Sequence, residues 1–336
     1  MHADTYPGVA HKPLAPSLPP SPPAATSSAP RDASGDPDSA CLDAVAGLPL
    51  RSARPLALHL HIPSFDDMPV PVFGGLPTYL AYLKREAALF AGMNEVGQLR
   101  FDGVSPASLS AAQVDSLMTH LRRHFRFVAD EAGEFEVRAD ARGTSPERIR
   151  LLRRLGFNCI SLDVGDDGAA PARVRGVAAA ARAAGFRSLR VVFAYGLPGQ
   201  GVDLLRRMLA TIIGAGPSRV ALQLHGGAMP AGAIAQRMRR HCIDQLGAAG
   251  YAGIGGDSFA LPGDDLAQAR RQAAARPSVS GIALQAAPRV VGCGVSAVGI
   301  VGALRSLNVA APGDYYALLD RHELPVAGGA HQMVAA

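Results

Sequence analysis

Two histidines near the end of a short apolar segment have the spacing of paired metal ligands. His59 and His61 are two residues apart in the expected strand Leu56–Ile62, so their side chains would point to the same face. Imidazole nitrogens bind zinc, and a hydrolase site would need further ligands from later strands. The residues that could provide them are Asp102, Glu136, Asp163 and His225. A bare pair of histidines is a weak signal, so we favour a structural or ligand-facing role and keep a metal-dependent barrel hydrolase as an alternative.

Three glycine-containing segments could bring backbone N–H groups close to an anionic ligand. They are Asp102–Pro106, Tyr195–Gln200 and Gly292–Ala297. Glycine and proline are also what a tight turn requires, so a turn is the default interpretation of each segment. No Ser-His-Asp order, phosphate-binding loop or dinucleotide fingerprint stands in the required strand-to-helix context. The motifs alone therefore indicate where a ligand could bind, but no reaction.

Cysteine spacing and composition exclude several classes of protein. The cysteines are Cys41, Cys159, Cys242 and Cys293, and no pair has the spacing of a zinc or iron–sulfur motif. The formal charge is +5, but the 33 Lys and Arg residues are spread along expected helices, which does not favour a nucleic-acid partner. No apolar run approaches the roughly 18 residues of a membrane span, and no leader peptide is recognisable. We expect a cytoplasmic protein.

Short β-type segments alternate with longer helical patterns after a proline-rich beginning. Residues 1–40 hold nine of the 26 prolines, which predicts a disordered tail. Alternation of this kind predicts parallel strands joined by crossover helices, in a barrel or a doubly wound sheet, with ligands at the carboxyl ends of the strands. The six expected strands are Leu56–Ile62, Gln98–Asp102, Glu134–Ala139, Asn158–Val164, Leu189–Tyr195 and Arg219–Leu224.

Helix boundary signals fall between these strands. Ser110 followed by Gln113 predicts a capping box, and Ser145 followed by proline and glutamate predicts another helix start. Gly156 and Gly185 follow helical patterns and predict helix ends. These signals agree with a strand–helix alternation.

Taken together and in order, these segments resemble the oxygen-independent coproporphyrinogen III oxidases, a radical S-adenosylmethionine family. The resemblance runs from about residue 42 to residue 320. It implies an α/β fold, a partial TIM-like (β/α)6 barrel, and the conversion of two propionates of coproporphyrinogen III to vinyl groups in haem synthesis. The matching segments are His61–Ile62–Pro63, Leu109–Phe127, Glu136–Val137, Tyr195–Pro198 with Gln200, Gly250–Ala269 and Gly292–Ala297.

The cluster positions depart from the family's pattern. Family members place three cysteines just after the His-Ile-Pro segment, where thiolates hold a [4Fe–4S] cluster that binds S-adenosylmethionine. The corresponding positions here are Phe65, Pro69 and Val72, and none of these side chains can bind iron. The resemblance implies that Gly103, Glu136 and Val298 are residual S-adenosylmethionine contacts. It also makes His59 and His61 candidates for side chains that face the pocket.

These departures imply a non-catalytic relative for which neither cluster nor S-adenosylmethionine is expected. The retained pocket would bind a tetrapyrrole or a nucleotide-like small molecule. An active coproporphyrinogen III dehydrogenase with non-standard cluster ligands is the alternative. The expected organisation is a tail at 1–40, a barrel with a C-terminal extension at 41–326, and a short tail at 327–336 without the family's C-terminal helical domain.

Overall fold

The computed structural model describes most of the chain between residues 54 and 327. The described ranges are 54–64, 74–92, 95–141, 143–164, 171–197, 199–225, 232–272, 276–278, 281–283, 289–301 and 304–327. The predicted tail at 1–40 lies outside these ranges, and so does 328–336, so both tails stay predictions.

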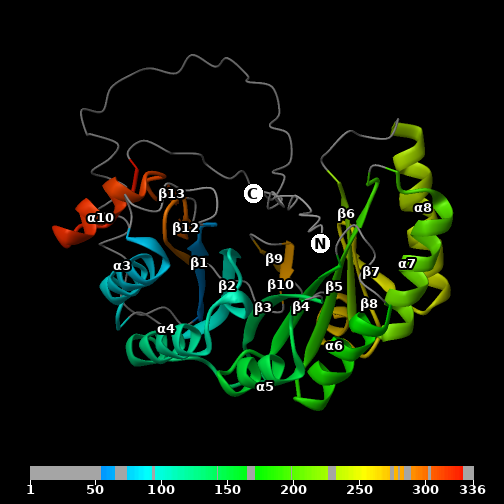
Figure 1. Ribbon diagram of the computed structural model, residues 1–336, viewed down its shortest axis with the longest axis horizontal. Coiled ribbons are helices and arrows are strands. Elements are labelled where there is room, and N and C mark those ends of the chain that lie inside the picture. The colour runs from blue at the N-terminus through cyan, green and yellow to red at the C-terminus, as the bar shows by residue number, and fades with distance from the viewer. Residues whose placement is uncertain are drawn as a thin grey trace, which may run out of the picture. The chain divides into compact units, whose positions relative to one another are not determined.

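Six neighbouring parallel strands form the centre of the sheet (Figure 1). Each pairs in parallel with the next along the chain. All six predicted strands are confirmed, and their boundaries differ from the prediction by at most two residues. They are β1 Leu56–Ile62, β2 Val96–Gly103, β3 Glu134–Asp140, β4 Cys159–Val164, β5 Ser188–Tyr195 and β6 Arg219–Leu224.

Helices connect successive strands and lie along the outer side of this sheet in Figure 1. This order of parallel strands and crossover helices confirms the predicted partial (β/α)6 barrel. The helices are α3 Gly75–Leu89, α4 Ala111–His124, α5 Pro146–Arg154, α6 Pro171–Ala183, α7 Val202–Ala215 and α8 Gly232–Ala248, and a short 3₁₀ turn, η1, spans Pro106–Ser108.

Further strands extend the sheet at both sides. The order is β13-β12-β11-β1-β2-β3-β4-β5-β6-β8-β7. β11 runs parallel to β1, whereas β12 and β13 are antiparallel, as are β8 and β7 beyond β6. The remaining elements are β7 Ala252–Gly255, β8 Ser258–Ala260, α9 Asp265–Arg271, the hairpin β9 Arg276–Ser278 with β10 Gly281–Ala283, β11 Arg289–Cys293, β12 Val298–Val301, β13 Leu304–Leu307 and α10 Pro312–Asp320.

Apolar periodicity and capping explain why these helices form and where they begin. On α4 the buried residues are Val114, Leu117, Met118 and Leu121, spaced as one helix face that packs on the sheet. The predicted capping box is confirmed, because Gln113 N donates to Ser110 Oγ at 3.2 Å and Ser110 N donates to Gln113 Oε1 at 2.8 Å. Full burial of each such side chain stabilises the fold by roughly 1.5 to 3 kcal/mol.

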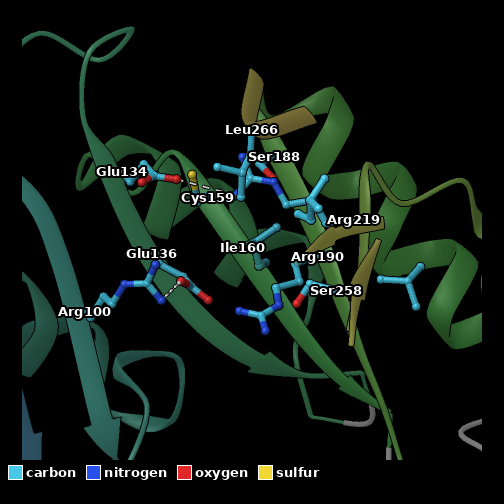
Figure 2. A pocket seen from close by; sticks show the side chains of 12 residues that line it. Arg100, Glu134, Glu136, Cys159, Ile160, Ser188, Arg190, Arg219, Ser258 and Leu266 are labelled. Atoms are coloured by element: carbon cyan, nitrogen blue, oxygen red, sulfur yellow. Dashed lines mark ion pairs between the residues drawn. The ribbon is translucent and has the colours of Figure 1, made fainter. Parts of the chain in front are cut away.

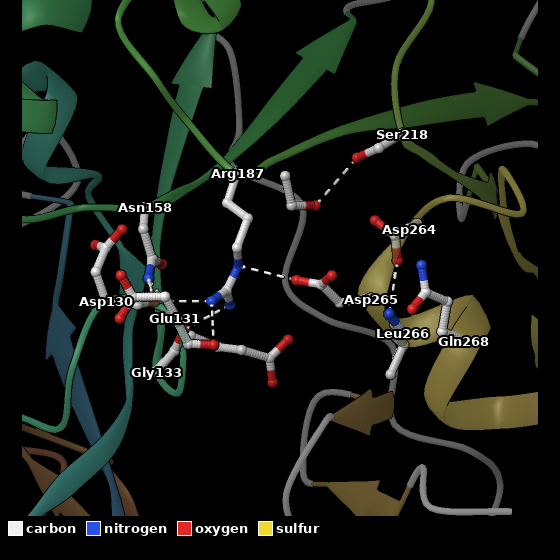
Figure 3. A network of polar contacts seen from close by, with 12 residues as sticks. Asp130, Glu131, Gly133, Asn158, Arg187, Ser218, Asp264, Asp265, Leu266 and Gln268 are labelled. Carbon is white, nitrogen blue, oxygen red and sulfur yellow. Dashed lines mark hydrogen bonds and ion pairs between the residues drawn. The ribbon is translucent and has the colours of Figure 1, made fainter. Parts of the chain in front are cut away.

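A polar network ties together the amino ends of the central strands (Figure 3). Arg187, just before β5, donates to the carbonyl oxygens of Asp130, Glu131 and Gly133 at 2.6 to 2.7 Å. Its Nε also lies 3.1 Å from a carboxylate oxygen of Asp265, the first residue of α9. Asn158 Nδ2 also donates to Asp130 O and Gly133 O, so the two side chains together hold the loop before β3, and Arg187 joins it to β5 and α9.

Candidate functional site

The carboxyl end of β1 packs against the loop that follows β11. His61 Nδ1 lies 2.5 Å from the carbonyl oxygen of Val295. Tyr79, on α3, donates from its hydroxyl to His61 O at 2.8 Å and accepts from Val295 N at 3.0 Å. His61 is therefore part of a structural contact between β1, α3 and the segment 292–297.

Two of the predicted glycine loops approach β1 too closely for a side chain. Gly294 has φ +105°, and a Cβ there would lie 2.2 Å from His61 O. Gly103 has φ +75°, and a Cβ there would lie 2.1 Å from Ile62 O. Both glycines are thus explained by packing and by left-handed backbone, which is the turn interpretation. A cofactor contact by Gly103 remains a prediction.

A buried carboxylate also binds the segment 292–297. Glu86 on α3 is 1% exposed and accepts hydrogen bonds from Gly294 N at 2.6 Å, Asn308 Nδ2 at 2.7 Å and Tyr315 Oη at 2.6 Å. Burial raises the pKa of Glu86 to about 7, although these three donors act in the opposite direction. The carboxyl group joins α3 to the loop after β11, to the segment after β13 and to α10.

His59 faces the inner side of the sheet beside Arg100 and Glu136. The strand register places His59 opposite Arg100 of β2, and Arg100 Nη1 lies 2.8 Å from Glu136 Oε2 of β3. Burial, followed by the charge of Arg100, lowers the pKa of His59 to about 4. His59 is consequently a neutral imidazole at pH 7, able to donate one hydrogen bond and accept another but not to act as a general acid.

Four arginines make the inner face of β2 to β6 rich in positive charge, and Figure 2 shows Arg100 and Arg190 on either side of Glu136. Burial alone would raise the pKa of Glu136, but the arginines outweigh it and hold the pKa below its ordinary value. Arg138 pairs with Asp163 at 2.8 Å, and Arg219 pairs with Asp264 at 2.9 Å. The arginines concerned are Arg100, Arg138, Arg190 and Arg219. This interior suits an acidic ligand.

Known proteins similar to this chain point to one family, although no protein-family model matches it. The oxygen-independent coproporphyrinogen III oxidase of Pseudomonas aeruginosa is 30% identical over 318 residues, covering 84% of this chain and 69% of the relative. The Escherichia coli protein of the same name is 30% identical over 323 residues, with the same coverage of each chain. This chain belongs to the oxygen-independent coproporphyrinogen III oxidase family.

The fold agrees with that family. The structure of coproporphyrinogen III oxidase from Escherichia coli, described as a radical SAM enzyme, matches with a TM-score of 0.76 at 26% identity. The match covers 89% of this chain and 76% of that one. Within the part of the chain that the structure describes, no helix is long and apolar enough to cross a membrane.

The residues predicted to form one pocket are only partly brought together. Glu136 and His59 meet around Arg100, and Gly103 lies opposite Ile62, the residue after His61, in the β1–β2 ladder. Val298 begins β12, which is separated from β1 by β11, so it does not neighbour the others in the sheet. The cluster positions Phe65, Pro69 and Val72 lie outside the described residues.

Metal ligands do not gather anywhere in the described residues. No group of three or more His, Cys, Asp or Glu side chains there could hold a metal ion, so the hydrolase built on His59 and His61 has no support. Cys159, Cys242 and Cys293 are free and buried on β4, α8 and β11. Burial raises the pKa of Cys159 and Cys242 to about 12 and that of Cys293 well above its usual value. These thiols stay protonated and far apart in the fold, which does not fit a shared cluster.

Sequence reasoning missed Glu86, Arg100 and Arg190 as notable residues. A signal for Arg100 was present, because Gln98, Arg100 and Asp102 alternate with apolar residues along β2. Such a period of two marks a strand whose inner face is polar. Glu86 gave no signal, since a glutamate within a helical pattern reads as a solvent-exposed residue.

Proposed function

We propose that this chain is a non-catalytic member of its family, which uses the barrel to bind an acidic small molecule and does not carry out radical chemistry. The strongest support comes from the residues at the three positions that, by the resemblance, correspond to the family's cluster cysteines. Phe65, Pro69 and Val72 have no atom that binds iron. No other set of thiolates is assembled among the described residues.

The arginine-rich interior supports the binding role. Four guanidinium groups face the space enclosed by β2 to β6, and three of them pair with carboxylates among the described residues. A tetrapyrrole with propionate groups, or a nucleotide-like molecule with phosphates, offers the negative charge that such an interior attracts. We favour the tetrapyrrole, because the relatives are named for coproporphyrinogen III.

Complementation separates binding from catalysis. The chain is expressed in a strain that lacks the family's enzyme and is grown without oxygen, with an active relative as positive control. The proposal expects no growth with this chain, while the purified protein binds coproporphyrin III in a visible absorbance titration. Growth equal to that of the control would mean that the chain is an active coproporphyrinogen III dehydrogenase with cluster ligands of a non-standard kind.

A further inference from the structure

A small cavity lies at the amino ends of the central strands (Figure 2). Its lining includes the first residues of four strands, namely Glu134, Cys159, Ser188 and Arg219. The cavity shares Arg100, Glu136, Arg190 and Arg219 with the arginine-rich interior described above, and His61 is not part of its lining. The cavity has a volume of about 40 Å³, enough for roughly three water molecules, or for the three heavy atoms of a carboxylate group.

Arg190 is the unpartnered charge of this cavity. Figure 2 shows its guanidinium extending from β5 into the space, toward the carboxylate of Glu136. Among the described residues, no hydrogen bond or ion pair of Arg190 is found, and the carboxylate of Glu136 is bound to Arg100 at 2.8 Å. Arg219 forms ion pairs with Asp264 at 2.9 Å and with Glu134 at 3.5 Å.

The positive charges of the lining are not all paired. Arg100 pairs with Glu136, and Arg219 pairs with Glu134 and Asp264, whereas no ion pair of Arg190 is found among the described residues. Arg100 also has an Nε that is buried without a hydrogen-bond acceptor. A guanidinium removed from water without an anion is costly, and a planar carboxylate satisfies two of its N–H groups at once.

We propose that Arg190 is the anchor of a carboxylate-binding site, in which the two oxygens of a carboxylate accept the parallel N–H groups of its guanidinium. Arg100 approaches from the opposite side and supplies a second positive charge. The carboxylate is either a free small acid or the end of a propionate group on a larger ligand. The site deepens the proposed binding role, because its arginines belong to the same interior, and acetate tests it without any tetrapyrrole.

Titration of the full-length protein with ¹³C-labelled acetate, in a chloride-poor buffer at pH 7, tests this site by the line width of the acetate signal. We expect a dissociation constant of about 1 mM, typical of one charge-assisted pair. Arg190→Gln should weaken binding about tenfold or more. The matched control is Arg206→Gln, which removes the same charge from an exposed position on α7 and should leave the affinity unchanged.

A second variant moves the affinity in the opposite direction, which a misfolded protein cannot imitate. Glu136→Gln removes the nearest competing carboxylate and releases Arg100, so acetate should bind several-fold more tightly. Addition of coproporphyrin III distinguishes the two sources of the carboxylate. If coproporphyrin III displaces acetate, the site binds a propionate group. If acetate stays bound, the site binds a free acid. The proposal is overturned if the wild-type protein does not bind acetate, or if Arg190→Gln and Arg206→Gln bind it alike.

Discussion

The buried Glu86 carboxyl group should make the stability of the protein depend on pH. Its pKa is raised to about 7 in the folded chain, compared with 4.5 for the ordinary side chain. Below pH 4.5 the group is protonated in both states, and its contribution to stability is fully present. As the pH rises to 7, the unfolded chain releases the proton while the folded chain keeps it, so unfolding becomes progressively more favourable.

The size of the effect follows from the difference between the two pKa values. Each unit corresponds to about 1.4 kcal/mol, so the free energy of unfolding should fall by about 3 kcal/mol through Glu86 between pH 4.5 and pH 7.5. Other groups also titrate in this range. Their contribution cancels when wild type is compared with Glu86→Gln, whose side chain at this position cannot ionise. The difference in stability between wild type and variant should shrink by this amount as the pH rises.

Urea unfolding, followed by circular dichroism at half-unit steps of pH, measures this difference. Glu86→Gln should be less stable than wild type at pH 4.5, because its amide cannot accept from all three donors. Asp115→Asn, at an exposed position of α4, is the matched control and should follow the wild-type curve. A difference between wild type and Glu86→Gln that stays constant or grows from pH 4.5 to 7.5 would refute the reasoning.

Three further substitutions test how the fold is held together, each by urea unfolding at pH 7. Arg187→Ala should lose about 1 to 3 kcal/mol, since Glu131 O loses its donor and Asp130 O and Gly133 O keep only Asn158 Nδ2; a loss no larger than that of the exposed control Arg206→Ala contradicts this. Gly294→Ala should cost about 3 kcal/mol or more because its Cβ would meet His61 O, whereas Gly214→Ala, within α7 and with open space around it, should stabilise by about 0.5 to 1 kcal/mol. Ser110→Ala should cost about 1 kcal/mol through loss of the capping box, and an unchanged midpoint would argue against that cap.

Local patterns were sufficient to predict the central strands and their connections. Alternation of apolar segments with helical periodicity located β1 to β6, and Ser110 and Ser145 marked helix starts because capping is a local interaction. The short flanking strands β7, β8, β12 and β13 were not predicted. They have three or four residues each, and their pairing is decided by the edge of the sheet that each one meets.

The interior contacts could not be predicted because they join distant parts of the sequence. Glu86 meets Gly294 and Tyr315, which are 208 and 229 residues further along the chain. His59 and His61 were correctly expected to share a strand face, but the sequence did not reveal that Arg100 lies opposite His59 or that His61 contacts Val295. Fold and family therefore followed from order and spacing, whereas the electrostatics of the interior required the structure.

Anaerobic iron–sulfur reconstitution, followed by iron and sulfide analysis, tests the central claim most directly. The wild-type chain should retain no cluster, while Phe65→Cys/Pro69→Cys/Val72→Cys, which restores the family's three thiolates, should bind about four irons per chain. An active relative reconstituted in parallel verifies the procedure. About four irons on the wild-type chain, with 5′-deoxyadenosine released from S-adenosylmethionine on reduction, would contradict the account and show that this protein is a radical enzyme.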